Sequence, residues 1–333
     1  MYRLLRFIES TIPNAEINGY WVNGDRVVFD RVEEPGKLLI GLPPRIPQHS
    51  PKYRLLPPEH VLLYVNRDYG VELPKLAETP MVFFGVKPCD VAAIRVLDSI
   101  LVARHPVYTQ KRSLLKLIVV EECLDPLDTC FCGDVGSGPA TKDYYDVSYA
   151  ALGDTVFFKA GTGVGVNLLR NIGLRKPSGP ELDKYESALK RAAEKASNKV
   201  PGLIEIRKAL ASSVVNVDLW RDLSKYCLAC GSCNYVCPTC FCTEIEDVIE
   251  GGSVSARVAK WVGCRTYTYG LVAGGHFRQE LYTRYRHFAL HKMVFYSEQV
   301  GVIGCVGCGR CSAWCPAGLD FKETLREVVK WYQ

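Results

Sequence analysis

The stretch CLACGSCNYVCPTCFC at residues 227–242 places six cysteines within sixteen residues, and a second cysteine run, CVGCGRCSAWCP, follows at residues 305–316. Both runs contain the pattern C-x2-C-x2-C-x3-C-P. In the first run it consists of Cys227, Cys230, Cys233, Cys237 and Pro238, and in the second of Cys305, Cys308, Cys311, Cys315 and Pro316. Two tight repeats of one cysteine pattern indicate that the chain binds metal.

In this pattern the first three thiolates of a run bind one [4Fe-4S] cluster and the fourth binds a second cluster, so two copies complete two clusters. The sequence predicts one cluster on Cys227, Cys230, Cys233 and Cys315, and another on Cys305, Cys308, Cys311 and Cys237. Two zinc sites are the alternative, because C-x2-C pairs also hold zinc. Zinc takes four ligands per site and leaves the third evenly spaced cysteine and the C-P unit unexplained, so the spacing favours iron and sulfide.

Single residues inside and beside the runs also carry expectations. Gly231 and Gly309 are expected to let backbone amides approach the sulfurs. Lys225 and Arg310 are next to predicted ligands in the sequence. We expect them to raise reduction potentials, because positive charge favours the reduced, more negative cluster.

Residues 243–304 separate the runs and form an insertion relative to a minimal two-cluster ferredoxin. We expect helices at TEIEDVIEGG, residues 243–252, with a glycine stop, and at YTRYRHFALHKMVFYSEQ, residues 282–299. The last helix is expected at residues 322–333, with one apolar stripe formed by Leu325, Val328, Val329 and Tyr332. Outside the two patterns, buried thiols are expected, with a ligand role as the alternative, at Cys240, Cys242 and Cys264.

Four more cysteines precede the runs: Cys89, Cys123, Cys130 and Cys132. The short apolar, β-rich segments MVFFGV at residues 81–86 and KLIVV at residues 116–120 end where these cysteines begin. Because α/β folds place sites at strand ends and four thiols complete one cluster, we expect a third [4Fe-4S] cluster here. Structural or merely buried thiols are the alternative, since the spacing matches no simple ferredoxin run.

These patterns predict an α+β protein. We expect an N-terminal α/β domain with the additional cluster site at residues 1–150, a mainly helical connector at 151–217, and a ferredoxin-type helical domain with two clusters at 218–333.

The segment TVFFKAGTGVGVNLL, residues 155–169, contains G-x-G-x-G but lacks the third glycine and the acidic residue of a dinucleotide fingerprint. It is interpreted as a β-to-α turn.

Bulk composition limits the class of protein. The chain has 333 residues, of which 48% are hydrophobic and 23% charged, and its net charge of +5 is spread out rather than gathered with aromatics into a nucleic-acid groove. No apolar run reaches the ~18 residues of a membrane span, and the first fourteen residues lack a signal-peptide core. Fifteen cysteines, an odd number in tight runs, favour metal in a reducing compartment. We expect a cytoplasmic protein without a membrane span or a nucleic-acid partner.

Several segments resemble the beta subunit of cytosolic nickel-iron hydrogenases, also called sulfhydrogenases, a family similar to the equivalent iron-sulfur subunit of anaerobic sulfite reductase. In chain order they are SPKYRLLPPEHVLLY, GVKPCDVAAIRVLD, TCFCGDVGSGP, CLACGSCNYVCPTCFCTEIEDV, WVGCRTY, HKM and CVGCGRCSAWCPAGLDF. The resemblance implies an electron relay within a complex. One partner would hold the nickel-iron site, another would hold FAD and bind NAD(P)H, and the clusters of the beta subunit would lie between them. It also implies ligand roles for the eight ferredoxin-type cysteines.

The leading hypothesis is therefore an iron-sulfur electron-transfer subunit of an oxidoreductase, relaying single electrons between a nickel-iron hydrogenase module and a flavin/NAD(P)H module. The sequence shows no base and nucleophile pair, so the chain is not expected to be catalytic alone. One alternative is the equivalent subunit of an anaerobic sulfite reductase, which a siroheme partner would distinguish. The other is a catalytic iron-sulfur enzyme whose N-terminal cluster has an open iron, which requires a cluster with three protein ligands.

Overall fold

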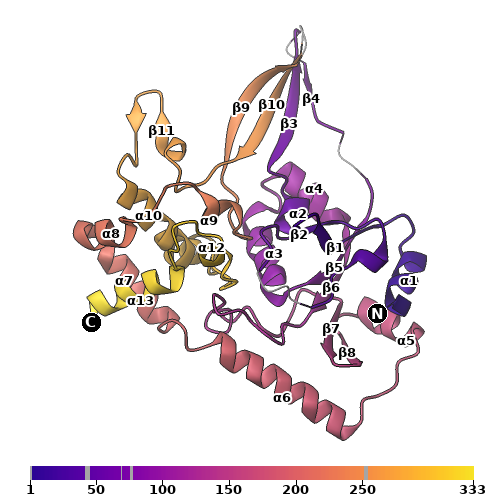
Figure 1. The fold of residues 1–333 in the computed structure, drawn as a ribbon. Helices are drawn as coiled ribbons and strands as arrows, with labels where there is room; N and C mark the ends of the chain where they lie inside the picture. Colours follow the sequence, from indigo (N-terminus) through magenta and orange to yellow (C-terminus); the bar gives the residue numbers. More distant parts are fainter. Residues whose placement is uncertain (1, 42–45, 69, 76–77, 251–253) are drawn as a thin grey trace.

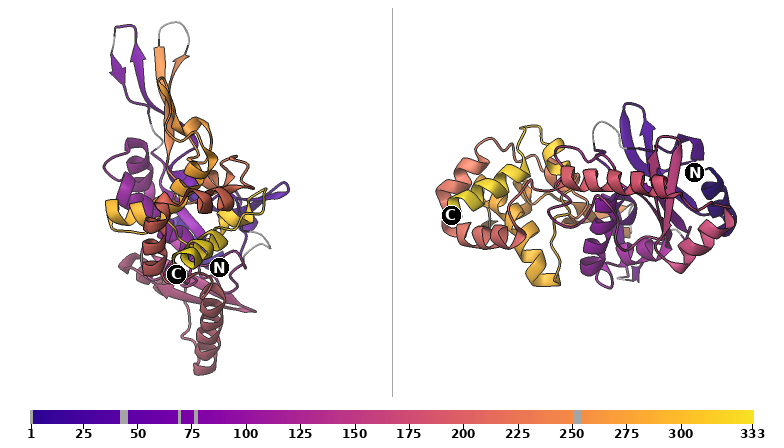
Figure 2. Two further views of the ribbon diagram at one scale, coloured as in Figure 1. Left: turned by 90° about the vertical axis from the view of Figure 1, so that its left-hand side faces the viewer. Right: turned by 90° about the horizontal axis from the view of Figure 1, so that it is seen from below.

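The computed structural model describes residues 2–41, 46–68, 70–75, 78–250 and 254–333. Figure 1 shows an N-terminal body built around a sheet, a C-terminal body of helices and loops, and an arm of strands that projects from the region between them. In the view from below, the two bodies lie side by side (Figure 2). Among the described residues, the structure contains no helix with the length and apolar character of a membrane-spanning segment.

The N-terminal body contains a six-stranded sheet in the order β2-β1-β5-β6-β7-β8. Its strands are β1 (Glu16–Asn23), β2 (Arg26–Arg31), β5 (Met81–Val86), β6 (Leu115–Glu121), β7 (Val147–Leu152) and β8 (Thr155–Ala160). The four central strands are parallel and the two edge strands pair antiparallel. Strands β5 and β6 confirm the predicted apolar strands; β5 is buried along its whole length, as expected for a central strand covered on both faces.

Helices cover both faces of this sheet. One face packs against α3 (Pro88–Leu101) and α4 (Pro106–Leu114), with Phe83 and Ile94 in the shared core. The other face packs against α1 (Tyr2–Thr11) and α5 (Gly163–Asn171), with Phe84 in that core. The segment with G-x-G-x-G forms the turn between β8 and α5, as interpreted from the sequence. Since β7 and β8 belong to one sheet, the N-terminal sheet continues past residue 150.

A long helix, α6 (Gly179–Ala196), runs below the molecule toward the C-terminal body (Figure 1). That body contains α7 (Leu203–Ser212), α8 (Val217–Ser224), α10 (Leu281–Leu290), a π-helical turn (His291–Phe295), α11 (Tyr296–Val300) and α13 (Phe321–Tyr332). The expected helix at residues 282–299 is thus present as one helical segment with a π turn inside it. On α13 the residues Leu325, Val328 and Val329 are buried, whereas Tyr332 is exposed.

The expected helix at residues 243–252 is wrong, because Thr243–Glu250 forms strand β9. It pairs antiparallel with β10 (Val254–Trp261), and β10 pairs with β3 (Glu59–Asn66), which in turn pairs with β4 (Val71–Glu72). Ile245, Val248 and Ile249 have helical spacing, but the β-branched residues and the available partner strands favour a sheet. The glycine stop at Gly251 and Gly252, like Met1, lies outside the described residues.

The four strands form the projecting arm in Figure 1 and join the insertion to an N-terminal strand. The remaining short strands, β11 (Leu271–Val272) and β12 (Gly275–His276), form a separate hairpin. The end of β10 lies beside the start of β9, because the two strands pair antiparallel with Thr243 opposite Trp261. Residues just before β9 and just after β10 are therefore neighbours.

Candidate metal centres

The two cysteine runs fold into matching loops. Each contains a one-turn helix, α9 (Ser232–Tyr235) or α12 (Arg310–Ala313), preceded by a glycine in the left-handed conformation: Gly231 with φ 74° and Gly309 with φ 72°. Ser232 Oγ of the first loop donates to Trp314 O of the second at 3.0 Å, so the loops contact each other directly. The cysteines of both runs therefore face a common region.

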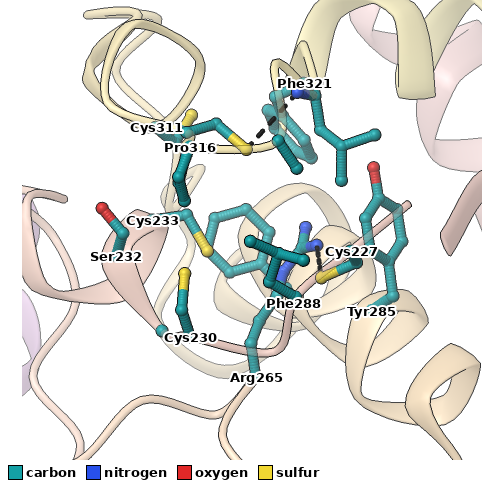
Figure 3. A pocket seen from close by; sticks show the side chains of 15 residues that line it. Cys227, Cys230, Ser232, Cys233, Arg265, Tyr285, Phe288, Cys311, Pro316 and Phe321 are labelled. Atoms are coloured by element: carbon teal, nitrogen blue, oxygen red, sulfur yellow. Dashed lines mark hydrogen bonds between the residues drawn. The ribbon is translucent and has the colours of Figure 1, made fainter. Parts of the chain in front are cut away.

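Cysteines from both runs line one pocket (Figure 3). Its free space is about 480 Å³ with the mouth included, and its cysteines are Cys227, Cys230, Cys233, Cys311 and Cys315. Two backbone amides donate to sulfurs here: Ala229 N lies 3.5 Å from Cys227 Sγ, and Leu319 N lies 3.3 Å from Cys315 Sγ. N–H···S bonds of this kind tune iron-sulfur clusters. The structure thus brings Cys315 of the second run to the three leading cysteines of the first.

The second predicted set contains Cys305, Cys308, Cys311 and, from the first run, Cys237. Burial raises the pKa of Cys305 to about 12 and that of Cys308 to about 11, and the charge of a Cys237 thiolate adds to both shifts. Cys237 Sγ lies 3.2 Å from Thr239 Oγ1, which donates to Gly304 O at 2.6 Å, so Cys237 lies near the start of the second run. This proximity is what the interleaved ligation requires; the ligation itself stays a prediction.

The four N-terminal cysteines gather at the ends of parallel strands. Cys89 lies in the first turn of α3, the helix that follows β5, and Cys123 follows β6. Burial raises the pKa of Cys132, and the thiolate charges of Cys130, Cys123 and Cys308 add to the shift. Burial also raises the pKa of Cys89, with contributions from Asp90, Cys308 and Cys132. These thiols therefore lie near one another and near the second run.

Backbone contact joins the N-terminal cysteine loop to the second run. Phe131 N donates to Gly307 O at 2.8 Å, and Cys130 Sγ donates to Cys308 O at 3.5 Å. A Cβ on Gly307 would lie 2.6 Å from Phe131 C and O, and one on Gly309 would lie 2.5 Å from Thr129 C and O. Gly309 therefore permits this close approach of two loops, and the backbone amide after it, Arg310 N, also hydrogen-bonds to the Cys308 sulfur. The amide that donates to Cys305 Sγ belongs to Gly307, at 3.4 Å.

Replacing Gly307 with alanine is expected to lower the free energy of unfolding by on the order of 2–3 kcal/mol, because the residue has φ 57° and its Cβ would meet backbone. The measurement is anaerobic thermal unfolding together with the iron content. Gly301→Ala is the matched control, since Gly301 has φ 74° but no atom within 4 Å of the added Cβ. Equal losses in both variants would show that the contact with Phe131 contributes nothing.

Arg310 forms a buried ion pair. Its Nη1 lies 2.8 Å from Asp90 Oδ1, and its Nη2 donates to the Tyr20 hydroxyl at 2.9 Å. The side chains of Arg310 and Asp90 are both fully buried. Lys225 is exposed and pairs with Asp222 at 2.7 Å. Each of these residues is thus paired with a carboxylate, and their effect on reduction potentials stays a prediction. Sequence adjacency to a ligand did not reveal these partners.

Replacing Arg310 with glutamine is expected to destabilise the protein by about 3–5 kcal/mol, because it leaves the buried Asp90 carboxylate without its partner. Denaturant unfolding under anaerobic conditions measures this loss. The double variant Arg310→Gln/Asp90→Asn should recover much of it, since both charges are then absent. A single variant as stable as the wild type would contradict the assignment.

Three buried cations lie near the cysteines and have no carboxylate partner among the described residues: Lys52, Arg265 and Lys292. Arg265 NH1 lies 3.8 Å from Cys227 Sγ, and its guanidinium group packs on the Tyr285 ring at 3.7 Å. The other two cations approach the region of Cys240. Burying an unpaired cation is costly, and an anionic iron-sulfur cluster with its thiolates would offset the cost. The side chains around the cysteines therefore suit such clusters.

Sequence reasoning missed the roles of these cations. Each stands in a segment used for the family resemblance, SPKYRLL, WVGCRTY or HKM, but a single basic residue beside apolar ones gives no sign of what surrounds it in space. Within the described ranges, no three Cys, His, Asp or Glu side chains form a group suited to one metal ion. The four ligands of a cubane bind four different irons, so their sulfurs need more room than the ligands of a single ion.

Comparison with known proteins gives the class and then the family. Residues 226–319 match the family described as a 4Fe-4S dicluster domain, so the chain is an iron-sulfur protein with a dicluster domain. Over 285 residues it is 31% identical to the protein named sulfhydrogenase 2 subunit beta of Pyrococcus furiosus, covering 84% of this chain and 82% of that protein. The chain belongs to this hydrogenase beta-subunit family. No solved structure matches it.

Proposed function

We propose that this chain is the iron-sulfur electron-transfer subunit of a cytoplasmic oxidoreductase complex, relaying single electrons between a nickel-iron hydrogenase module and a flavin/NAD(P)H module. The observation that carries the proposal is the continuous series of cysteine groups from the N-terminal loop, through the second run, to the pocket in Figure 3. The name of the Pyrococcus relative supports the hydrogenase assignment. All fifteen cysteines are free of disulfides, which fits a reducing compartment.

In this proposal the chain binds two [4Fe-4S] clusters with the interleaved ligands predicted from the sequence, and a third with Cys89, Cys123, Cys130 and Cys132. The clusters supply the one-electron chemistry. The protein binds them, excludes water and sets their potentials through buried cations and N–H···S bonds. The gathering of four thiols in the N-terminal set supports full cysteine ligation there and gives no support to an open iron at that position.

One end of the series reaches the surface. Cys230 is exposed, and its neighbours Tyr226 and Leu228 are 67% and 65% exposed. Electron transfer between proteins requires close approach of the redox groups, so we assign contact with one redox partner to this face. The opposite end of the series lies against the N-terminal sheet.

The test is anaerobic purification of the tagged chain from its native cells, with analysis of nickel and flavin. We expect both to copurify, and we expect hydrogen gas and NADPH each to reduce the clusters, as followed by electron paramagnetic resonance. A preparation without nickel would overturn the hydrogenase assignment. A siroheme absorption spectrum in place of nickel would instead identify a component of a sulfite reductase.

A further inference from the structure

Three cysteines remain outside the proposed clusters, and the arm brings them together at its base. Cys240 and Cys242 directly precede β9, and Cys264 follows β10. The register places Thr243 opposite Trp261, and Val262 N donates to Cys242 O at 3.0 Å. The two ends of an antiparallel hairpin are held within one strand spacing of each other. The fold of the insertion therefore fixes this group, which the sequence pattern alone leaves scattered.

One hydrogen-bond donor lies at two of the three sulfurs. Asn234 is buried, and its Nδ2 lies 3.1 Å from Cys264 Sγ and 3.6 Å from Cys240 Sγ. The third sulfur, Cys242 Sγ, donates to Tyr269 OH at 3.9 Å. One amide donating to two sulfurs is an arrangement that stabilises thiolates, because hydrogen bonds to the charged form favour it.

Two buried ammonium groups lie beside the same cysteines. Lys52 is 2% exposed, and its Nζ donates to Cys240 O at 3.1 Å and to Tyr235 O at 3.3 Å and lies 3.6 Å from the centre of the Trp261 ring. Lys292 is also 2% exposed, and its Nζ donates to Thr239 Oγ1 at 2.7 Å. Neither has a carboxylate partner among the described residues. Lys292 also lies near the second predicted cluster, because Thr239 Oγ1 is 3.2 Å from Cys237 Sγ. Lys52 contacts Cys240 directly, and a buried cation requires negative charge nearby, which a neutral thiol does not supply.

We propose that Cys240, Cys242 and Cys264 bind a further iron-sulfur cluster through three thiolates, with Lys52 and Lys292 compensating its negative charge. This site is additional to the three clusters of the proposed function. The twelve cysteines assigned to those clusters leave three of the fifteen in the chain, so one iron of a [4Fe-4S] cluster here has no cysteine ligand. Such an iron is open to an exogenous ligand.

The test compares iron and acid-labile sulfide in anaerobically purified protein before and after the substitution Cys240→Ser/Cys264→Ser. We expect the variant to lose about four irons per chain, while the paramagnetic resonance signals of the other clusters remain. Ser255→Ala, in the arm but away from the thiols, is the matched control and should retain all iron. Cys242→Ser, which changes a partly exposed residue, is a second variant in case the first does not fold.

Unchanged iron in a folded variant would overturn this inference. A loss of zinc in place of iron would also overturn it, because the site would then hold a single ion. Failure of the proposed function gives a different result, namely the absence of nickel and flavin partners with the iron content unaffected. The two proposals can therefore fail separately.

Discussion

Replacing Cys237 with serine is expected to remove the cluster of the second run and to leave the cluster of its own run in place. The reason is the interleaved pattern, in which the fourth cysteine of each run ligates the other cluster. In the structure, the charge of Cys237 affects both Cys305 and Cys308, whereas Cys315 lines the pocket formed by the first run. The converse is expected of Cys315→Ser, which should remove the cluster bound by Cys227, Cys230 and Cys233.

The measurement is the iron content and the paramagnetic resonance spectrum of each dithionite-reduced variant. Each substitution should cost up to about four irons per chain, and the signal lost in Cys237→Ser should be the one lost in Cys305→Ser. Cys237→Ser and Cys315→Ser are controls for each other, because a variant that fails to fold would lose the signals of both clusters. If Cys237→Ser and Cys227→Ser remove the same signal, each run binds its own cluster and the interleaved scheme is wrong.

The sequence predicts local patterns more readily than it predicts which distant segments meet. Ligand spacing is local, so the eight ferredoxin-type cysteines could be recognised from the pattern and assigned before their positions in space were known. The strands at residues 81–86 and 116–120 were equally clear, because continuous apolar runs in central strands need no partner to be recognised. The N-terminal cysteines could be placed only at strand ends.

The arm shows where local reasoning fails. In Thr243–Glu250 the spacing of three apolar residues fits a helix, but the segment pairs with β10, which pairs in turn with β3, almost two hundred residues away in the chain. The grouping of Cys240 and Cys242 with Cys264 follows from the pairing of β9 with β10. Periodicity did not predict this strand pairing, so the sequence did not show that the three cysteines are neighbours.

Charge compensation is likewise a property of the folded molecule. Arg310 is adjacent to a predicted ligand in sequence, yet its charge is compensated by Asp90, some two hundred residues earlier. Arg265 is distant in sequence from the first three cysteines of its pocket, yet it contacts Cys227 and has no carboxylate partner among the described residues. We therefore expect Arg265, on the basis of its three-dimensional contact with Cys227, to have the larger effect on a cluster.

Replacing Arg265 with glutamine is expected to lower the midpoint potential of one cluster by on the order of 100 mV. A positive charge favours the reduced cluster, which carries one more negative charge, so removing the guanidinium group makes reduction harder. At a separation of about 5–6 Å and an effective dielectric constant of about 20, one unit charge contributes about 3 kcal/mol, which corresponds to roughly 130 mV for one electron. Arg265 Nη1 lies 3.8 Å from Cys227 Sγ, and only 6% of the residue is exposed. Solvent therefore screens its charge only weakly.

An anaerobic redox titration followed by paramagnetic resonance measures this shift, and only the cluster that includes Cys227 should change. Arg265→Lys retains the charge and should stay within a few tens of millivolts of the wild type, although an ammonium group cannot reproduce the packing of a guanidinium group on Tyr285. Lys225→Gln is the surface control, because Lys225 is exposed and ion-paired, and its removal should have little effect. An unchanged potential in Arg265→Gln would mean that water or another protein of the complex, and not this cation, balances the charge of the cluster.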